Sequence, residues 1–127
     1  MAQVYGNRTL LIQRVLEELK IAAYGQPPSA AEFEATDQPL DEILAECAAR
    51  NIAYVEAPHN NEQTIPLEIL HPLAQVVARH VANKYSIGAD EVNQMFQPEE
   101  HPFSPENRCR AVTRTRPHFA PAVPDYY

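Results

Sequence analysis

The 127-residue sequence predicts a small all-α domain, similar to a four-helix bundle, followed by an extended C-terminal tail. Apolar residues recur at helical spacing in several segments, and most of the twelve prolines fall outside those segments, where they start or stop helices. Only three glycines are present, which argues against a sheet of tight hairpins that need positive φ angles. The length suits one hydrophobic core. We therefore expect a helical domain at residues 1–115 and an extended docking tail at residues 116–127.

The first helix is predicted at about residues 9–23. Its apolar positions form one helical stripe: Leu11, Ile12, Val15, Leu16 and Leu19. Asn7 or Thr9 is expected to cap its first N–H groups. Gly25 and the pair Pro27-Pro28 are expected to end it.

A second helix is predicted to open at Ser29, because Ser29 and Glu32 have the spacing of a capping box. One helical phase then continues across Pro39, through Phe33, Leu40, Ile43, Leu44 and Cys47. Pro39 either kinks one long helix or starts another that Thr36 or Asp37 caps. The unbroken phase favours nearly collinear pieces. Residues 52–55 are either a small strand or a packed extended linker.

The third helix should begin near Thr64 and Pro66, with Pro72 in or near its first turn. Its wide apolar stripe predicts burial on more than one side: Ile69, Leu70, Leu73, Val76, Val77, His80, Val81 and Tyr85. A shorter fourth helix should start at Ala89 or Asp90 and end before Pro98. Residues 98–105 are predicted as a loop, and residues 105–114 as an additional helical piece that Ser104 caps.

The charge is divided unevenly along the chain. Residues 1–104 hold six Lys/Arg and fifteen Asp/Glu, a net charge of −9, whereas residues 105–127 have a net charge of +2. The acidic body should repel a phosphate backbone, so sequence-specific DNA binding is not expected. The basic end is attractive to an acidic surface, such as that of a neighbouring subunit, or is simply a solvated terminus.

The sequence carries no recognisable catalytic or metal-binding motif, so we expect no enzyme activity, cofactor or metal. His71 and His80 lie nine residues apart, which places them on roughly opposite faces of a helix. We interpret His80 as a core or interface histidine rather than a ligand, and Cys47 as a small core residue. No signal peptide or membrane-spanning run is evident, so a soluble protein made in a cytoplasm is expected.

The last residues are the candidate partner-binding site. Stiff prolines and aromatic side chains alternate there without helical periodicity, so docking would cost little entropy and the rings would supply contact area. A disordered terminus is the alternative. The candidate residues are Arg114, Arg116, Pro117, Phe119, Val123, Tyr126 and Tyr127.

The order of these features resembles a known family. An opening helix and a Tyr-Gly-Gln-Pro-Pro spacer precede an acidic helix and a linker with Ile65 and Pro66. A third helix then runs into Asn-Lys-Tyr-Ser-Ile-Gly at residues 83–88, and an Arg-Pro tail ends in Pro-Asp-Tyr-Tyr. The chain thereby resembles the head-to-tail connector adaptors of tailed bacteriophages and gene transfer agents, also called packaged-DNA-stabilising or head-completion proteins. It departs from them at residues 89–115, where prolines interrupt a commonly longer helix.

The resemblance implies a structural virion protein made in the host cytoplasm. Such adaptors form a ring, usually of twelve copies, under the portal protein; the ring extends the DNA channel and docks tail or neck proteins. An acidic lumen would let packaged DNA pass without sequence-specific binding, and the tail would reach the portal or a neighbouring adaptor copy. Assembly after capsid filling would leave the isolated protein monomeric. The alternative is a small cytoplasmic helical regulator that binds a partner protein through its extended C-terminus.

Overall fold

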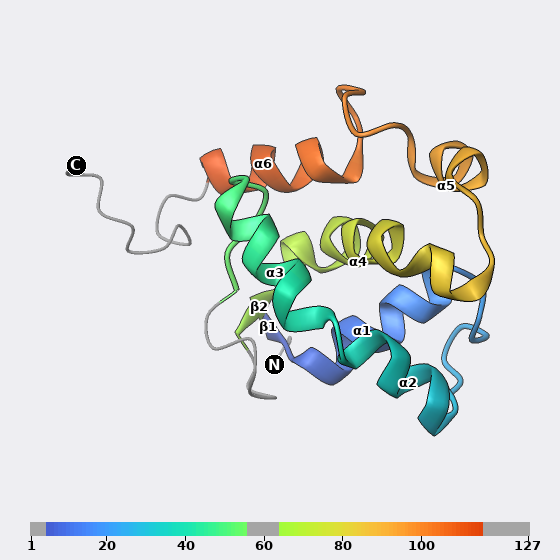
Figure 1. The fold of residues 1–127 in the computed structure, drawn as a ribbon. Coiled ribbons are helices and arrows are strands. Elements are labelled where there is room, and N and C mark those ends of the chain that lie inside the picture. The colour runs from blue at the N-terminus through green and yellow to red at the C-terminus, as the bar shows by residue number, and fades with distance from the viewer. Residues whose placement is uncertain (1–4, 56–63, 116–127) are drawn as a thin grey trace.

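The computed structural model describes residues 5–55 and 64–115, with side chains up to residue 112, and it is mostly helical (Figure 1). The prediction of a small all-α domain is confirmed. The four predicted helices are present, with the second divided at Pro39 and a further helix after Ser104. The helices are α1 (Arg8–Glu18), α2 (Ala30–Asp37), α3 (Leu40–Ala49), α4 (Leu67–Val81), the 3₁₀ helix η1 (Ala82–Tyr85), α5 (Ala89–Phe96) and α6 (Pro105–Thr115).

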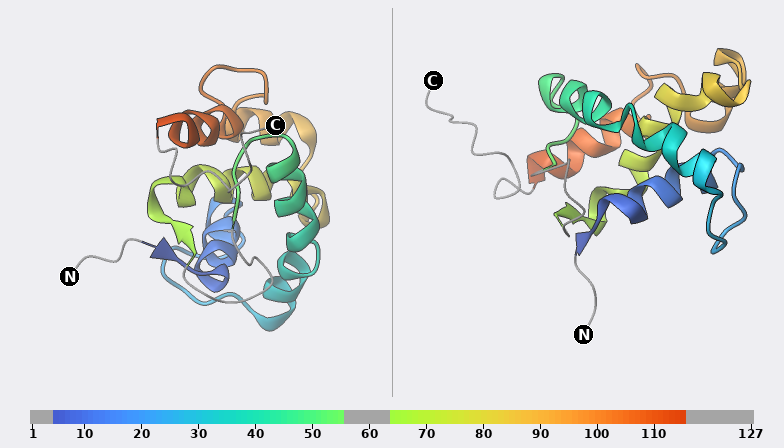
Figure 2. Two further views of the ribbon diagram at one scale, coloured as in Figure 1. Left: turned by 90° about the vertical axis from the view of Figure 1, so that its left-hand side faces the viewer. Right: turned by 60° about the horizontal axis from the view of Figure 1, so that its bottom comes forward.

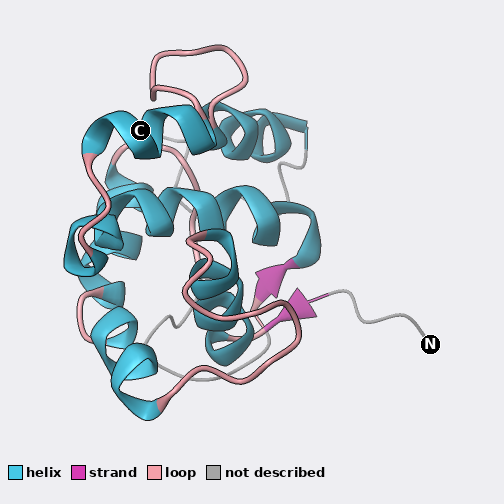
Figure 3. Ribbon diagram, turned by 90° about the vertical axis from the view of Figure 1, so that its right-hand side faces the viewer, coloured by secondary structure: helices cyan, strands magenta, loops and turns pink. Residues whose placement is uncertain are grey.

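A two-stranded antiparallel sheet, which was not predicted, joins the residues just before α1 to those just before α4. Strand β1 (Tyr5–Gly6) pairs with β2 (Ile65–Pro66), with Tyr5 opposite Pro66 and Gly6 opposite Ile65. The sheet lies at the edge of the helices (Figure 3). Each strand is too short to show an alternating pattern in the sequence, so only the pairing reveals it.

Helix α4 is the centre of the domain, with α6 on one side and α1 on the other (Figure 1). Every residue from Pro72 to Ala78 is buried, which confirms the predicted burial on more than one side. Pro72 is the sixth residue of α4, just beyond the first turn, and its nitrogen cannot donate to the Glu68 carbonyl. The surrounding packing keeps the helix continuous there.

Helix α1 ends at Glu18, earlier than the predicted residue 23, so Gly25 and the following prolines do not end it. The chain reverses at Lys20, which has a φ of 61° in the left-handed region. The Ile21 N–H donates to the Leu16 carbonyl at 2.9 Å, and the Lys20 N–H donates to the Glu17 carbonyl at 3.0 Å. These two bonds form a Schellman motif, which usually places glycine where Lys20 stands.

The same ending occurs after α3 and after η1, with Asn51 and Ser86 in the left-handed conformation. In each case the next residue is an isoleucine that packs against the core: Ile21, Ile52 and Ile87. Packing of the isoleucine against the core holds its strained neighbour in place. Positive φ angles in the described residues are therefore not confined to the glycines.

Replacing Lys20 by glycine is expected to raise the free energy of unfolding by about 0.5–1 kcal/mol, because glycine adopts the left-handed conformation without strain. Urea denaturation of the full chain measures the change. Lys20→Ala is the control, since alanine removes the lysine side chain but keeps the strained conformation. Equal stability of the glycine and alanine variants would contradict this account.

Helices α2 and α3 follow one line, with a break at Gln38 and Pro39 (Figure 2). The predicted capping box is confirmed: the Glu32 N–H donates to Ser29 Oγ and the Ser29 N–H to Glu32 Oε1. Pro39 occupies the N-cap position of α3 and no side chain caps that helix, so the predicted cap by Thr36 or Asp37 is wrong. Thr36 is instead buried within α2, where its hydroxyl lies 3.2 Å from the Tyr85 hydroxyl.

Residues 52–55 form no strand, and three of the four are buried, so the packed extended linker is the correct interpretation. Helix α5 begins after Gly88 and ends before Pro98, as predicted. The Asn107 N–H donates to Ser104 Oγ at 3.2 Å, which confirms the predicted cap of α6.

No helix among the described residues has the length and apolar character that crossing a membrane requires.

Candidate functional site

The structure leaves most of the predicted partner-binding site undescribed. Arg114 belongs to the last turn of α6, but its side chain is not described. The other candidates lie outside the described residues: Arg116, Pro117, Phe119, Val123, Tyr126 and Tyr127. Their role in binding therefore stays a prediction, and the described residues identify the surfaces to which such a tail or another partner could bind.

The strongest charge feature is an acidic segment, residues 21–49, which contains no lysine or arginine. Its six carboxylates belong to α2 and α3, which follow one line at an edge of the domain (Figure 2). The carboxylates are Glu32, Glu34, Asp37, Asp41, Glu42 and Glu46. All except Glu32 and Asp37 belong to the exposed class, so the edge presents negative charge to solvent.

Arg8 of α1 compensates part of this charge. Its guanidinium donates to Asp37 Oδ1 and to Asp41 Oδ1, each at 2.6 Å, and to the Asp37 carbonyl at 2.9 Å. Burial lowers the pKa of Arg8, but the hydrogen bonds and charges of the two aspartates outweigh it and raise that pKa above its ordinary value. Arg8 therefore stays cationic and ties α1 to the junction of α2 and α3.

The rest of the acidic edge is weakly compensated. Glu46 lies 3.5 Å from Arg50 and 3.8 Å from His80. Glu34 and Glu42 have no ion-pair partner among the described residues. Exposed ion pairs such as Glu46–Arg50 contribute at most about 1 kcal/mol. Binding of a cationic segment would neutralise these carboxylates.

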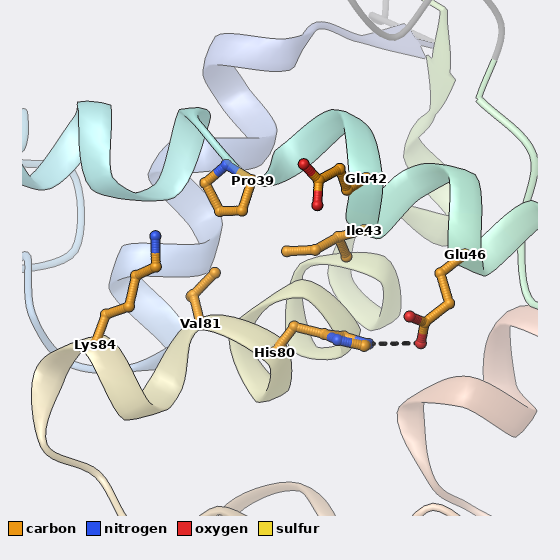
Figure 4. Close-up of a pocket in the computed structure, with 7 residues that line it drawn as sticks. All are labelled: Pro39, Glu42, Ile43, Glu46, His80, Val81 and Lys84. Atoms are coloured by element: carbon orange, nitrogen blue, oxygen red, sulfur yellow. Dashed lines mark ion pairs between the residues drawn. The ribbon is translucent and has the colours of Figure 1, made fainter.

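A small groove of about 240 Å³ lies between α3 and α4 (Figure 4). His80 points across it toward Glu46, and Lys84 donates to the Ala35 carbonyl at 3.2 Å. Its lining is Pro39, Glu42, Ile43, Glu46, His80, Val81 and Lys84. His80 is half-buried and lies 3.8 Å from Glu46, and its interpretation as a core or interface histidine rather than a ligand stays a prediction. Nowhere in the described part of the chain do three or more His, Cys, Asp or Glu side chains come together as metal ligands.

His71 lies in a different environment, near α1. Its Nδ1 atom is 3.7 Å from Glu18 Oε2, and its Nε2 atom is 3.4 Å from Gln75 Nε2. The predicted separation of His71 and His80 onto different sides of α4 is therefore confirmed, and they do not form one site.

A larger groove of about 670 Å³ lies between α1, the segment after it and α2, and we call it the α1–α2 groove. Its lining is Thr9, Gln13, Pro27, Pro28, Ala30, Phe33, Glu34 and Asp37. The sequence did not predict this groove, because Pro27 and Pro28 were interpreted as a helix stop and Phe33 as part of the apolar stripe of the second helix. Phe33 is only partly buried, so one side of its ring packs against the core while the rest borders the groove.

A buried ion pair, also missed, holds the C-terminal helices together. Arg79 of α4 lies 2.8 Å from Glu106 of α6, whose side chain is 2% exposed. The same guanidinium donates to Asn93 Oδ1 at 3.1 Å and to the Gln97 carbonyl. Arg79 thus joins α4, α5 and α6.

The loop between α5 and α6 presents an aromatic side chain from a braced backbone. The Phe103 side chain is 72% exposed. The Glu99 carbonyl accepts from Ser104 Oγ at 2.8 Å, and the His101 carbonyl accepts from Asn107 Nδ2 at 2.9 Å. A large exposed ring on a braced backbone is a suitable anchor for a protein contact, because the loop has little conformational freedom to lose.

The two thiols should be nearly inert in the native protein. Cys47 and Cys109 are free and buried, and burial raises the pKa of the Cys47 thiol from 9.0 to about 12. Burial also raises the pKa of the Cys109 thiol, and repulsion from the Cys47 sulfur, once that is ionised, adds to the effect.

Because the thiolate is the reactive form, Cys47 should react about a thousand-fold more slowly at neutral pH than a free thiol. Labelling with a thiol reagent, with the urea-unfolded chain as reference, measures this ratio, and rapid labelling of the native chain would contradict it.

Comparison with known proteins returns no match, neither to a family, nor to a curated protein, nor to a solved structure.

Proposed function

We propose that this chain is a head-to-tail adaptor, a structural virion protein that forms a ring under the portal of a tailed bacteriophage or gene transfer agent. The ring would extend the DNA channel and dock tail or neck proteins. The observation that carries the proposal is the order of features along the sequence: opening helix, Pro-Pro spacer, acidic helix, Ile-Pro linker, apolar helix with Asn-Lys-Tyr-Ser-Ile-Gly, and Arg-Pro tail.

The acidic edge supports this proposal on physical grounds. Exposed carboxylates on α3, namely Asp41, Glu42 and Glu46, would repel the phosphates of passing DNA and prevent adhesion to the channel wall. Residues 21–49 contain no basic residue that would bind phosphate. We assign the α3 face as the surface that borders the channel.

Electron microscopy of the chain mixed with the portal protein from its own genome tests the proposal. Size-exclusion chromatography of each protein alone provides the reference, in which the chain is expected to be a monomer. New ring density under the portal is the expected result. No association with the portal, with a stable monomer or dimer throughout, would refute the adaptor and favour the helical regulator.

A charge reversal on α3 tests the channel assignment. Particles with Glu42→Lys are expected to release DNA more slowly than the wild type, because lysine at the channel wall attracts phosphate. Glu91→Lys on α5 is the matched control, since Glu91 is an exposed carboxylate on another helix. Equal release rates from wild-type and Glu42→Lys particles would remove α3 from the channel.

A further inference from the structure

The α1–α2 groove combines an apolar floor with an acidic rim. Pro27, Pro28, Ala30 and Phe33 supply the apolar surface, and Glu34 and Asp37 supply the carboxylates. Asp37 is paired with Arg8, whereas the exposed Glu34 interacts only with the Gln38 amide, at 3.4 Å, among the described residues. The groove therefore suits an apolar segment that carries positive charge at one end.

We propose that this groove binds residues 116–127 of a second copy of the chain. The proposal rests on the ring proposed above for its biological setting, and it names the contact that would link neighbouring subunits in that ring. If the tail bound the portal instead, the groove would be left empty.

Charge complementarity favours this occupant. Arg114, in the last turn of α6, and Arg116, the first residue of the tail, place two positive charges where the tail begins, and Asp125, the acidic residue of the tail, lies near its other end in the sequence. The groove lies in the acidic segment, where residues 21–49 contain six carboxylates and no lysine or arginine. Attraction between the arginines and the Glu34 rim would also fix the direction of the bound segment.

The chemistry of the remaining tail residues matches the groove floor. Pro117, Pro121 and Pro124 favour an extended backbone, and Phe119 and Val123 supply apolar side chains between them. Proline-rich extended segments commonly bind grooves lined by aromatic residues and prolines, since little entropy is lost on binding. Phe33, Pro27 and Pro28 provide such a lining.

The position of the groove favours a second copy over the same chain. Helix α6 ends at Thr115 on the side of the domain opposite α2, as both Figure 1 and Figure 2 show. A twelve-residue extended tail spans about 37 Å, enough to reach an adjacent molecule. Because tail and groove are different surfaces, each copy would bind the next head to tail, which is the type of contact that closes into rings.

Photo-crosslinking in the full-length chain tests this inference. A benzophenone amino acid replaces Phe119, and the protein is mixed with an equal amount of ¹⁵N-labelled chain, so that mass spectrometry distinguishes crosslinks between copies from those within one copy. Crosslinks between copies that map to residues 24–37 are the expected result, both in the portal-bound assembly and in the protein alone at millimolar concentration.

Charge variants then test the specificity of the contact. Glu34→Lys is expected to reduce the crosslinking yield about three- to ten-fold, while Glu100→Lys, at an exposed carboxylate outside the groove, should leave it unchanged. Combining Glu34→Lys with Arg114→Glu and Arg116→Glu should restore the yield. An equal loss with Glu34→Lys and Glu100→Lys, or no rescue, would overturn the assignment of Glu34 as the contact.

The outcomes separate this inference from the adaptor proposal. A ring under the portal with crosslinks only to the portal, or only within one chain, would overturn the groove assignment and leave the adaptor proposal standing. Crosslinks between copies to the groove without any portal association would support the groove assignment and refute the adaptor. Absence of crosslinks between copies in the protein alone, together with no portal association, would overturn both.

Discussion

Replacing Glu106 by alanine is expected to lower the free energy of unfolding by about 3–5 kcal/mol, the usual cost of breaking a buried ion pair. The substitution leaves the Arg79 guanidinium, whose side chain is only 16% exposed, without its carboxylate. It also removes a link between α4 and α6, which pack closely. Since small domains have a total stability of about 5–15 kcal/mol, this one change would strongly reduce the folded population. Urea denaturation followed by circular dichroism measures the difference.

Two controls identify the cause of that loss. Glu46→Ala removes a carboxylate from the exposed pair with Arg50 and should cost less than about 1 kcal/mol. The double variant Arg79→Met/Glu106→Leu removes both charges and should recover most of the stability lost by Glu106→Ala. If Glu106→Ala and Glu46→Ala prove equally mild, the Arg79–Glu106 pair is not a principal link between the helices.

Replacing Leu73 by alanine is expected to cost a similar amount, about 3–5 kcal/mol, through loss of apolar burial and formation of a cavity. Leu73 is completely buried at the middle of α4, the helix that packs against both α1 and α6. Neighbours on two sides would have to move to fill the space, which makes complete relaxation difficult. Thermal unfolding followed by calorimetry measures the effect as a lower melting temperature.

Leu67→Ala is the matched control, because Leu67 belongs to the same helix but is 36% exposed. Its loss should cost less than about 1 kcal/mol, since less apolar surface returns to water. A large loss in both variants would contradict this account, because alanine has a higher helix propensity than leucine and Leu67 has less apolar surface to lose.

Local signals in the sequence were sufficient to locate most helices. The capping box at Ser29, the cap at Ser104 and the stop at Pro98 each act within a few residues, and the structure has a helix boundary at each of them. The apolar stripe of α4 likewise predicted a helix buried on several sides. These features depend on hydrogen bonds and periodicity within one segment, which are visible without knowledge of the fold.

Helix ends determined by tertiary packing were not visible in the same way. Lys20, Asn51 and Ser86 adopt left-handed conformations that a glycine would adopt more easily, and of these three residue types only asparagine is common at such positions. Each is held by packing of the isoleucine that follows, so the ending depends on the core formed by distant segments. This is why α1 stops at Glu18 rather than at the glycine and prolines downstream.

The sequence by itself determined the helical class, the acidic character of residues 21–49, the net positive charge of residues 105–127 and the proline-rich character of the tail, since these follow from composition and short-range periodicity. Only the tertiary structure decided that Arg79 pairs with Glu106, that Arg8 binds the junction of α2 and α3, and that Phe33 borders a groove with Pro27 and Pro28. Those contacts join residues far apart along the chain or on different elements. Their geometry arises when the helices pack around α4.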